Sequence, residues 1–163
     1  LIKVCEAMGA DLTLLNEDHD NAEPTADLLV RTSSLKGCVI EGDIIPTLID
    51  ELPTIAMMAC FAEGTTVIRD AAELKVKETN RIDTVTAGLK AMGADITPTD
   101  DGMIIHGGKP LHGAVVDSHK DHRIAMTFAI AALAADGETE ILDADCVDIS
   151  YPSFYKELKM LTH

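Results

Sequence analysis

The apolar residues of this chain recur alternately with a helical and a strand-like period, at short intervals. Between residues 80 and 92 they recur at steps of three and four, which predicts one amphipathic helix ended by Gly93. The same criteria predict helices at 1–8, 53–62, 121–135 and 152–161, strands at 11–15, 27–32, 38–41, 65–69, 95–98, 103–106, 114–117 and 139–143, and a polar loop at 16–25. Helices and strands that alternate in this way indicate the α/β (α+β) class.

Two segments of the chain occur twice. Residues 6–13 (EAMGADLT) return 84 residues later as KAMGADIT, and residues 62–70 (AEGTTVIRD) return 73 residues later as ADGETEILD. A repeat of this kind indicates that one unit of helices and strands is used twice. The two different spacings mean that the copies differ in loop length.

Two of the predicted helices are apolar on every side. Residues 55–62 have the sequence IAMMACFA, and residues 124–133 have the sequence IAMTFAIAAL. A helix without a polar face is buried all round. In a chain of this size, we therefore expect the helices inside and the sheets outside.

The charge balance excludes several kinds of partner. The chain has 163 residues, enough for one ordinary domain, and 13 Lys and Arg against 28 Asp and Glu give a net charge of −15. This acidic excess opposes nucleic-acid phosphates and anionic lipid head groups. The longest nearly apolar run, at 124–135, is shorter than the ~20 residues that span a bilayer. We therefore expect neither a nucleic-acid nor a membrane partner.

The cysteines and the first residues bear on the cellular context. None of the four cysteines forms a CxxC pair, which predicts buried free thiols in a reducing compartment and hence a cytoplasmic protein. The chain begins at Leu1, with neither an initiator Met nor a signal peptide, so we expect a piece of a longer protein.

The few basic residues are clustered, and four of the 13 lie between residues 69 and 81. If a helix begins near Glu78, then Lys77, Glu78 and Arg81 lie in its first turn, where free N–H groups and the helix dipole attract an anion. The alternative is a solvated helix face with a charge pair at i and i+4.

Two further polar segments precede the buried helices. Arg123 follows Asp121 and His122 at the N-terminal end, or mouth, of the helix at 121–135, where a guanidinium needs a carboxylate or phosphate partner. Asp50 occupies the mouth of the other buried helix, and its alternative role is a helix N-cap. We expect the three mouths to converge at one end of the domain and to combine anion binding with acid and base groups. No spacing of His and acidic residues suits a metal.

Four segments together resemble the 5-enolpyruvylshikimate-3-phosphate synthase family: KVKETNRI at 75–82, DHRIAM at 121–126, IDELP at 49–53 and SYPSFY at 150–155. The resemblance covers about residues 1–161 and most of the family's C-terminal domain. It implies a two-lobe enzyme whose lobes are built of repeated β/α units, with buried helices inside and sheets outside. Residues 1–163 then form a single C-terminal lobe, and the N-terminal lobe lies outside this chain.

The resemblance implies transfer of the enolpyruvyl group from phosphoenolpyruvate to the 5-hydroxyl of shikimate 3-phosphate, with release of phosphate, in aromatic amino acid biosynthesis. The reaction proceeds through a tetrahedral intermediate and uses no cofactor or metal. The implied partners are the two substrates and the N-terminal lobe, within a monomer. Because the cleft needs both lobes, we expect this chain alone to be inactive.

The resemblance also implies roles for five residues of this chain. Asp50 contacts the ring hydroxyls of shikimate 3-phosphate and is a candidate base. Glu78 protonates the methylene carbon of phosphoenolpyruvate and later removes a proton from it. Lys77 reaches shikimate 3-phosphate, while Arg81 and Arg123 bind phosphoenolpyruvate.

Other positions belong to the implied substrate site or depart from the family pattern. Asp121 and His122 belong to the substrate site, and so does Glu73, where the family sometimes has Asn. Ile149 stands two residues before Tyr151, where the family commonly has a Lys that contacts phosphoenolpyruvate.

Two other functions stay open at the level of the sequence. One is the related UDP-N-acetylglucosamine enolpyruvyl transferase, which uses a different acceptor. The other is a non-catalytic module that kept the fold and binds anions.

Overall fold

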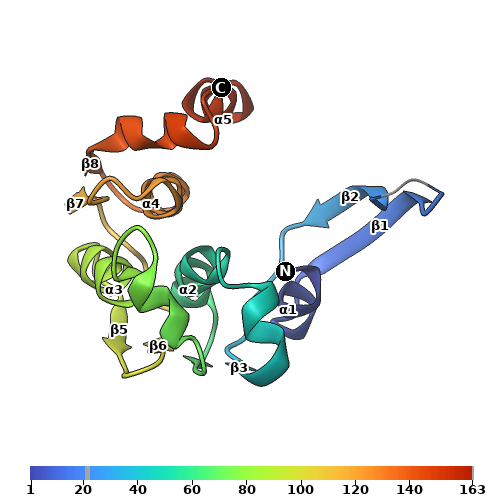
Figure 1. Ribbon diagram of the computed structural model, residues 1–163, viewed down its shortest axis with the longest axis horizontal. Coiled ribbons are helices and arrows are strands. Elements are labelled where there is room, and N and C mark those ends of the chain that lie inside the picture. Colours follow the sequence, from blue (N-terminus) through green and yellow to red (C-terminus); the bar gives the residue numbers. More distant parts are fainter. Residues whose placement is uncertain (21–22, 163) are drawn as a thin grey trace.

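A computed structural model describes residues 1–20 and 23–162, and it shows two copies of one unit followed by a last helix (Figure 1). The first copy comprises α1 (Ile2–Ala7), β1 (Asp11–Asp18), β2 (Thr25–Arg31), β3 (Val39–Ile40), the 3₁₀ helix η1 (Gly42–Thr47), α2 (Leu52–Phe61), β4 (Thr65–Ile68) and the 3₁₀ helix η2 (Ala72–Val76). The second copy comprises α3 (Arg81–Ala91), β5 (Asp95–Pro98), β6 (Met103–His106), β7 (Val115–Asp117), α4 (His122–Leu133), β8 (Glu140–Leu142) and the 3₁₀ helix η3 (Ala144–Ile149). Helix α5 (Phe154–Thr162) follows.

The two copies share their backbone conformation at the glycines that end their helices. Gly9 and Gly93 have φ angles of 86° and 93°, and Gly64 and Gly137 have φ angles of 91° and 95°. Glycine is favoured there because this left-handed region is costly for side chains with a Cβ atom. The repeat found in the sequence is therefore also a repeat of the structure.

Strands from both copies form the main sheet. Its order is β3-β4-β6-β5, with β3 parallel to β4 and the other neighbours antiparallel. Strands β7 and β8 form a parallel pair, and β1 and β2 form a separate antiparallel hairpin. The main sheet thus joins the two copies into one layer.

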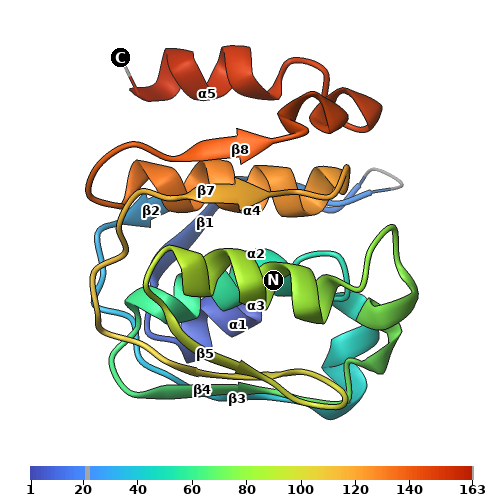
Figure 2. The ribbon, with the colours of Figure 1, turned by 90° about the vertical axis from the view of Figure 1, so that its left-hand side faces the viewer.

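The helices occupy the interior, as predicted. Figure 2 shows α2 and α3 between the main sheet on one side and α4 on the other. No residue of α2 is exposed, which confirms that this helix is buried all round. Helix α4 is less covered, because Leu133 near its end is 54% exposed. The prediction of complete burial is therefore wrong for α4, which contacts β8 and η3 in addition to α2 and α3 but leaves Leu133 uncovered.

Some predicted boundaries differ from the structure. Strand β1 continues to Asp18 rather than ending at residue 15, through a residue of positive φ, Asn16, and an irregular register with β2. The predicted loop at 16–25 is therefore shorter, and its residues 21–22 lie outside the described residues. The three 3₁₀ helices were not predicted, because each has only five or six residues, too few for the apolar spacing of a helix to show in the sequence.

The four cysteines are free, but only Cys60 is buried, whereas the other three are half-buried.

None of the helices within residues 1–20 and 23–162 is long and apolar enough to cross a membrane.

Candidate active site

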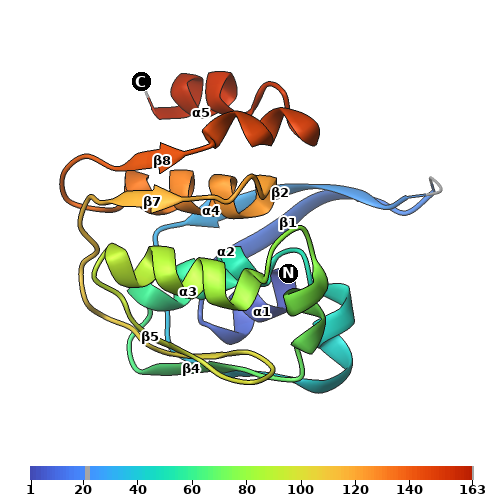
Figure 3. The ribbon, with the colours of Figure 1, turned by 60° about the vertical axis from the view of Figure 1, so that its left-hand side comes forward.

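The mouths of the central helices lie at one end of the molecule. Figure 3 shows α3 and α4 beginning on the same side, where η1 leads into α2. The ion pairs described below join residues from all three mouths, so the predicted convergence is confirmed.

Helix α3 begins later than the charge cluster suggested. Its N-cap is Asn80, whose side-chain oxygen accepts a hydrogen bond from the backbone N–H of Asp83 at 3.4 Å. Lys77 and Glu78 consequently lie in the loop between η2 and α3, and their predicted place in the first turn is wrong. The polar side chain of Asn80 starts the helix, since it satisfies a first-turn donor that the preceding residues leave open.

Asp121 caps helix α4 from a fully buried position. Its Oδ1 accepts hydrogen bonds from the backbone N–H groups of Arg123 at 3.0 Å and of Ile124 at 3.4 Å. The hydroxyl of Thr79 donates to its Oδ2 at 3.1 Å. The carboxylate of Asp121 is 0% exposed and is therefore enclosed by protein donors.

Arg81 connects the three mouths although its side chain is only 1% exposed. Its Nε donates to Oδ2 of Asp121 at 2.8 Å, its Nη1 to Oδ1 of Asp50 at 2.8 Å, and its Nη2 to Oε2 of Glu78 at 2.6 Å. Burial opposes the charged guanidinium, but the bonds to Asp121 and Asp50 and the charge of Glu78 outweigh it and raise the pKa of Arg81. Arg81 is thus a permanent cation that holds three carboxylates.

Asp50 lies one residue before Glu51, the N-cap of α2, and therefore does not cap the helix itself. The carboxylate of Asp50 is 42% exposed and lies 3.9 Å from Nη2 of Arg123 and 4.0 Å from Nζ of Lys77. Partial burial opposes its charged form, yet the hydrogen bond from Arg81 and the charges of Arg123, Arg81 and Lys77 together lower the pKa of Asp50. Asp50 is therefore a carboxylate at neutral pH.

The two other cations of the site are shared between carboxylates. Arg123 is 37% exposed, and its Nη1 lies 3.5 Å from Oε1 of Glu51. Nζ of Lys77 lies 2.8 Å from Oε1 of Glu73, and this hydrogen bond raises the pKa of Lys77. The i, i+4 pair of the alternative interpretation therefore exists, but Lys77 also faces Asp50.

One predicted site residue, His122, and the position that departs from the family pattern, Ile149, stand apart from this network of ion pairs. His122 is half-buried, and within the described part of the chain its buried Nδ1 has no hydrogen-bond partner. Ile149 ends η3 with 74% of its side chain exposed.

The sequence reasoning missed two members of the site. Thr79 supports Asp121, and Glu51 pairs with Arg123. The acidic pair of Glu51 beside Asp50 at a helix start was a visible signal, whereas the role of Thr79 depends on a contact across 42 residues.

Carboxylates outnumber cations in the site. It contains three cations and five carboxylates: Lys77, Arg81, Arg123, Asp50, Glu51, Glu73, Glu78 and Asp121. Such a site binds an anion when the anion replaces an exposed carboxylate on a cation, and it supplies carboxyl groups for proton transfer.

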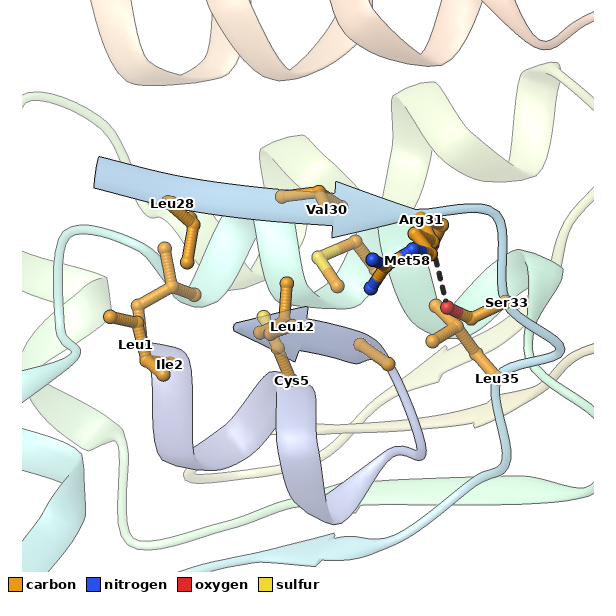
Figure 4. Close-up of a pocket in the computed structure, with 11 residues that line it drawn as sticks. Leu1, Ile2, Cys5, Leu12, Leu28, Val30, Arg31, Ser33, Leu35 and Met58 are labelled. Atoms are coloured by element: carbon orange, nitrogen blue, oxygen red, sulfur yellow. Dashed lines mark hydrogen bonds between the residues drawn. The ribbon is translucent and has the colours of Figure 1, made fainter. Parts of the chain in front are cut away.

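A separate pocket of about 350 Å³ lies between α1 and the β1–β2 hairpin (Figure 4). Its lining is mainly apolar, and Arg31 and Ser33 are at its edge. None of the described residues that line it carries a carboxylate, whereas the acid and base groups described above lie at the helix mouths.

Comparison with known proteins places this geometry in a family. The profile of EPSP synthase (3-phosphoshikimate 1-carboxyvinyltransferase) matches residues 1–158. The 3-phosphoshikimate 1-carboxyvinyltransferases of Thermoanaerobacter sp. (strain X514) and Bacillus licheniformis are 57% and 56% identical, and each match covers 99% of this chain and 38% of the relative. The chain thus spans little more than a third of the length of these relatives.

Solved structures agree with the sequence comparison. An EPSP synthase from Acinetobacter baumannii is 42% identical and superposes with a TM-score of 0.92, covering 98% of this chain and 38% of that one. The enolpyruvyl transferase NikO from Streptomyces tendae, at 19% identity and a TM-score of 0.66, shares the fold. The matched residues include the helix mouths that carry the ion pairs around Arg81, and the chain belongs to the EPSP synthase family.

Proposed function

We propose that this chain is the C-terminal lobe of an enzyme that transfers the enolpyruvyl group of phosphoenolpyruvate to the 5-hydroxyl of shikimate 3-phosphate. The observation that carries the proposal is the position of Arg81, which holds Glu78, Asp50 and Asp121 together where the three helix mouths meet. Family membership supplies the reaction class, and the network of ion pairs supplies the groups that the reaction needs.

Glu78 is the proposed proton carrier. Its carboxyl group is 49% exposed, so a substrate can reach it, while Arg81 holds it at 2.6 Å. In the first step Glu78, after taking up a proton, gives it to the methylene carbon, while the 5-hydroxyl oxygen bonds to the adjacent carbon and passes its own proton to Asp50, the proposed base. In the second step Glu78 takes a proton back from the resulting methyl carbon, the double bond forms again, and phosphate leaves with the electrons of its C–O bond.

The cations of the mouth bind the substrate anions. Arg123 is the most exposed of the three and is proposed to bind phosphoenolpyruvate. Lys77 is proposed to reach shikimate 3-phosphate from beside Asp50, whose charged carboxylate accepts hydrogen bonds from the ring hydroxyls. The N–H groups of Arg81 already donate hydrogen bonds to three carboxylates. Phosphoenolpyruvate therefore binds Arg81 only by replacing Glu78 or Asp50, the two partners that are partly exposed.

Asp121 and its neighbours take supporting roles in this proposal. Because Asp121 is 0% exposed, we assign it to the positioning of Arg81 and of the first turn of α4, rather than to direct substrate contact. His122, with its unengaged Nδ1, and the exposed Glu73 are proposed at the rim of the substrate site. Ile149 cannot supply the cation expected at its position, so Arg123 carries more of the phosphoenolpyruvate charge.

The rest of the longer protein completes the proposal. With three cations against five carboxylates, this lobe needs cations from the N-terminal lobe to hold two anionic substrates together. We propose that the reaction needs no cofactor, because acid, base and cationic groups suffice for proton transfer and phosphate departure. We also propose that the protein is a monomer and lies in the cytoplasm, a reducing compartment that suits its free cysteines.

Substitution of Glu78 by Gln in the full-length protein tests the proposal. If Glu78 carries the proton, kcat falls by ~10² to 10⁴ while both KM values stay close to those of the wild type, because Gln keeps the shape and the acceptor of Glu. Solvent deuterium also stops entering the methylene group of phosphoenolpyruvate. Glu140→Gln, an exposed change on β8, is the matched control.

Unchanged kcat and deuterium exchange in the Glu78 variant would contradict the proposed mechanism. Turnover with UDP-N-acetylglucosamine instead of shikimate 3-phosphate would support the related transferase. Binding of phosphoenolpyruvate without turnover in the wild type would support a non-catalytic module.

A further inference from the structure

Glu51 has an unusual position at the start of α2. It is the N-cap residue, yet its side chain makes no capping hydrogen bond. The side chains that usually cap a helix are those of Ser, Thr, Asp and Asn, and Glu is not one of them. Here the carboxylate turns to Nη1 of Arg123 instead, 3.5 Å away and 72 residues along the chain.

The two helices that carry this pair are held together one turn deeper. The hydroxyl of Thr127 donates to the carbonyl of Arg123 at 2.8 Å, so Thr54 is the donor in the 3.3 Å contact between the Thr54 and Thr127 hydroxyls. Two side-chain contacts therefore join α2 to α4: Glu51 to Arg123 at the helix starts, and Thr54 to Thr127 one turn deeper. The deeper contact involves the backbone carbonyl of Arg123, whereas the guanidinium of Arg123 is paired with Glu51 and Asp50.

Asp50 competes with Glu51 for the same guanidinium. Nη2 of Arg123 lies 3.9 Å from Asp50, whereas Nη1 lies 3.5 Å from Glu51. Without the carboxylate of Glu51, Asp50 would be the remaining acidic partner of Arg123 among the ion pairs of the described residues. Arg123 would then fold onto Asp50 and present fewer of its donors to a substrate.

We infer that Glu51 is a positioning residue that shares Arg123 with Asp50 and keeps its guanidinium from closing fully onto Asp50, so that Arg123 binds phosphoenolpyruvate. The inference rests on the proposed function. It assigns Glu51 an effect on the affinity for phosphoenolpyruvate and none on the proton transfer by Glu78.

Two variants of the full-length enzyme separate positioning from charge. Glu51→Ala removes both the charge and the acceptor, and we expect the KM for phosphoenolpyruvate to rise about three- to fivefold, the scale of a partly exposed ion pair. Glu51→Gln keeps an acceptor for Arg123, so its KM for phosphoenolpyruvate stays at or below the wild-type value. In both variants kcat and the KM for shikimate 3-phosphate stay unchanged.

Asp95→Asn is the matched control, since it removes a carboxylate from the exposed pair with Lys109 at the opposite end of α3. Equal effects of the Ala and Gln variants would overturn the inference, because they would indicate charge alone. An unchanged KM in Glu51→Ala, or parallel changes in kcat and both KM values, would also overturn it.

A measurement without turnover distinguishes failure of this inference from failure of the proposed function. The ¹⁵N NMR signal of the Arg123 Nε–H group is assigned by its loss in Arg123→Lys. We expect this signal to shift in Glu51→Ala and to return toward the wild-type position in Glu51→Gln. An inactive wild type would refute the proposed function, whereas an Arg123 signal that is insensitive to Glu51 would refute the positioning role.

Discussion

Asp50 and Arg123 occupy equivalent positions in the two copies of the repeat, 73 residues apart, and their charged groups face each other at 3.9 Å. Thr54 and Thr127 have the same spacing and are also in contact, at 3.3 Å. Equivalent side chains meet only where the two copies adjoin, so the candidate site lies at the junction between them. The copies differ there in charge, since one contributes an acid and the other a base.

Removing Arg81 should destabilise the protein strongly. In Arg81→Ala the carboxylate of Asp121 stays buried without its guanidinium partner, which typically costs about 3 to 5 kcal/mol in the free energy of unfolding. Denaturant unfolding of the full-length protein measures the loss. Arg31→Ala, which breaks an exposed pair with Asp11, is the control and should cost less than about 1 kcal/mol. Similar losses in both variants would contradict the structural role of Arg81.

The lowered pKa of Asp50 predicts a pH dependence with a defined sign. Its pKa is lower in the folded state than the value near 3.9 of an unfolded chain, so its stabilising contribution is complete above about pH 5 and is lost as the pH falls through the folded pKa. The difference in unfolding free energy between wild type and Asp50→Asn should therefore shrink from pH 5 to pH 2. A difference that grows on acidification would contradict the lowered pKa.

Cys60 should resist thiol reagents in the native protein. Burial raises the pKa of its thiol to about 12, so almost no thiolate exists at pH 8. Mass spectrometry after a short reaction with a maleimide should show Cys60 unmodified, whereas the half-buried Cys5, Cys38 and Cys146 react first. In denaturant all four should react alike, and early modification of native Cys60 would show that its burial is wrong.

Gly88→Ala should destabilise the contact between α3 and α4. A Cβ atom at Gly88 would lie 2.0 Å from Cζ of Phe128, so the ring must move, at a cost of about 1 to 3 kcal/mol. At an exposed helix position the same change would stabilise by up to about 1 kcal/mol. Thermal unfolding shows whether Gly88→Ala stabilises or destabilises the protein. Phe128→Leu in the Gly88→Ala background should recover part of the lost stability, because the smaller side chain makes room for the added Cβ atom.

Arg123→Ala should separate the two substrates of the proposed reaction. Loss of a partly exposed guanidinium should weaken phosphoenolpyruvate binding by about 2 kcal/mol and leave shikimate 3-phosphate nearly unaffected. Isothermal titration of the full-length enzyme with each substrate gives both affinities. Lys77→Met is the comparison variant and should weaken shikimate 3-phosphate instead, and equal weakening of both substrates by Arg123→Ala would contradict its assignment.

Local pattern was enough to predict the central helices and the repeat. Apolar spacing located α2, α3 and α4 within a few residues, and Gly93 and Gly137 ended their segments because their positive φ angles suit glycine. The continuous apolar surface of α2 predicted its burial. The polar residues at the helix starts were also recognisable, since a charge at the end of a buried helix needs a partner.

The local sequence pattern led to a wrong prediction where a capping residue or the packing of distant segments decided the structure. Asn80 moved the start of α3 to Arg81 because its side chain caps the helix. Leu133 stays exposed because too little of the chain covers the far side of α4, although its sequence is as apolar as that of a core helix.

The sequence by itself determined the residue types of the candidate site: two arginines, a lysine and several carboxylates at helix mouths. Only the tertiary structure decided their partners, with Arg81 buried between Asp50, Glu78 and Asp121, and Arg123 left exposed beside Glu51. The physical reason is that helix periodicity acts over a few residues, whereas Asp50, Arg81 and Asp121 are 31 and 40 residues apart and meet only through the packing of α2, α3 and α4.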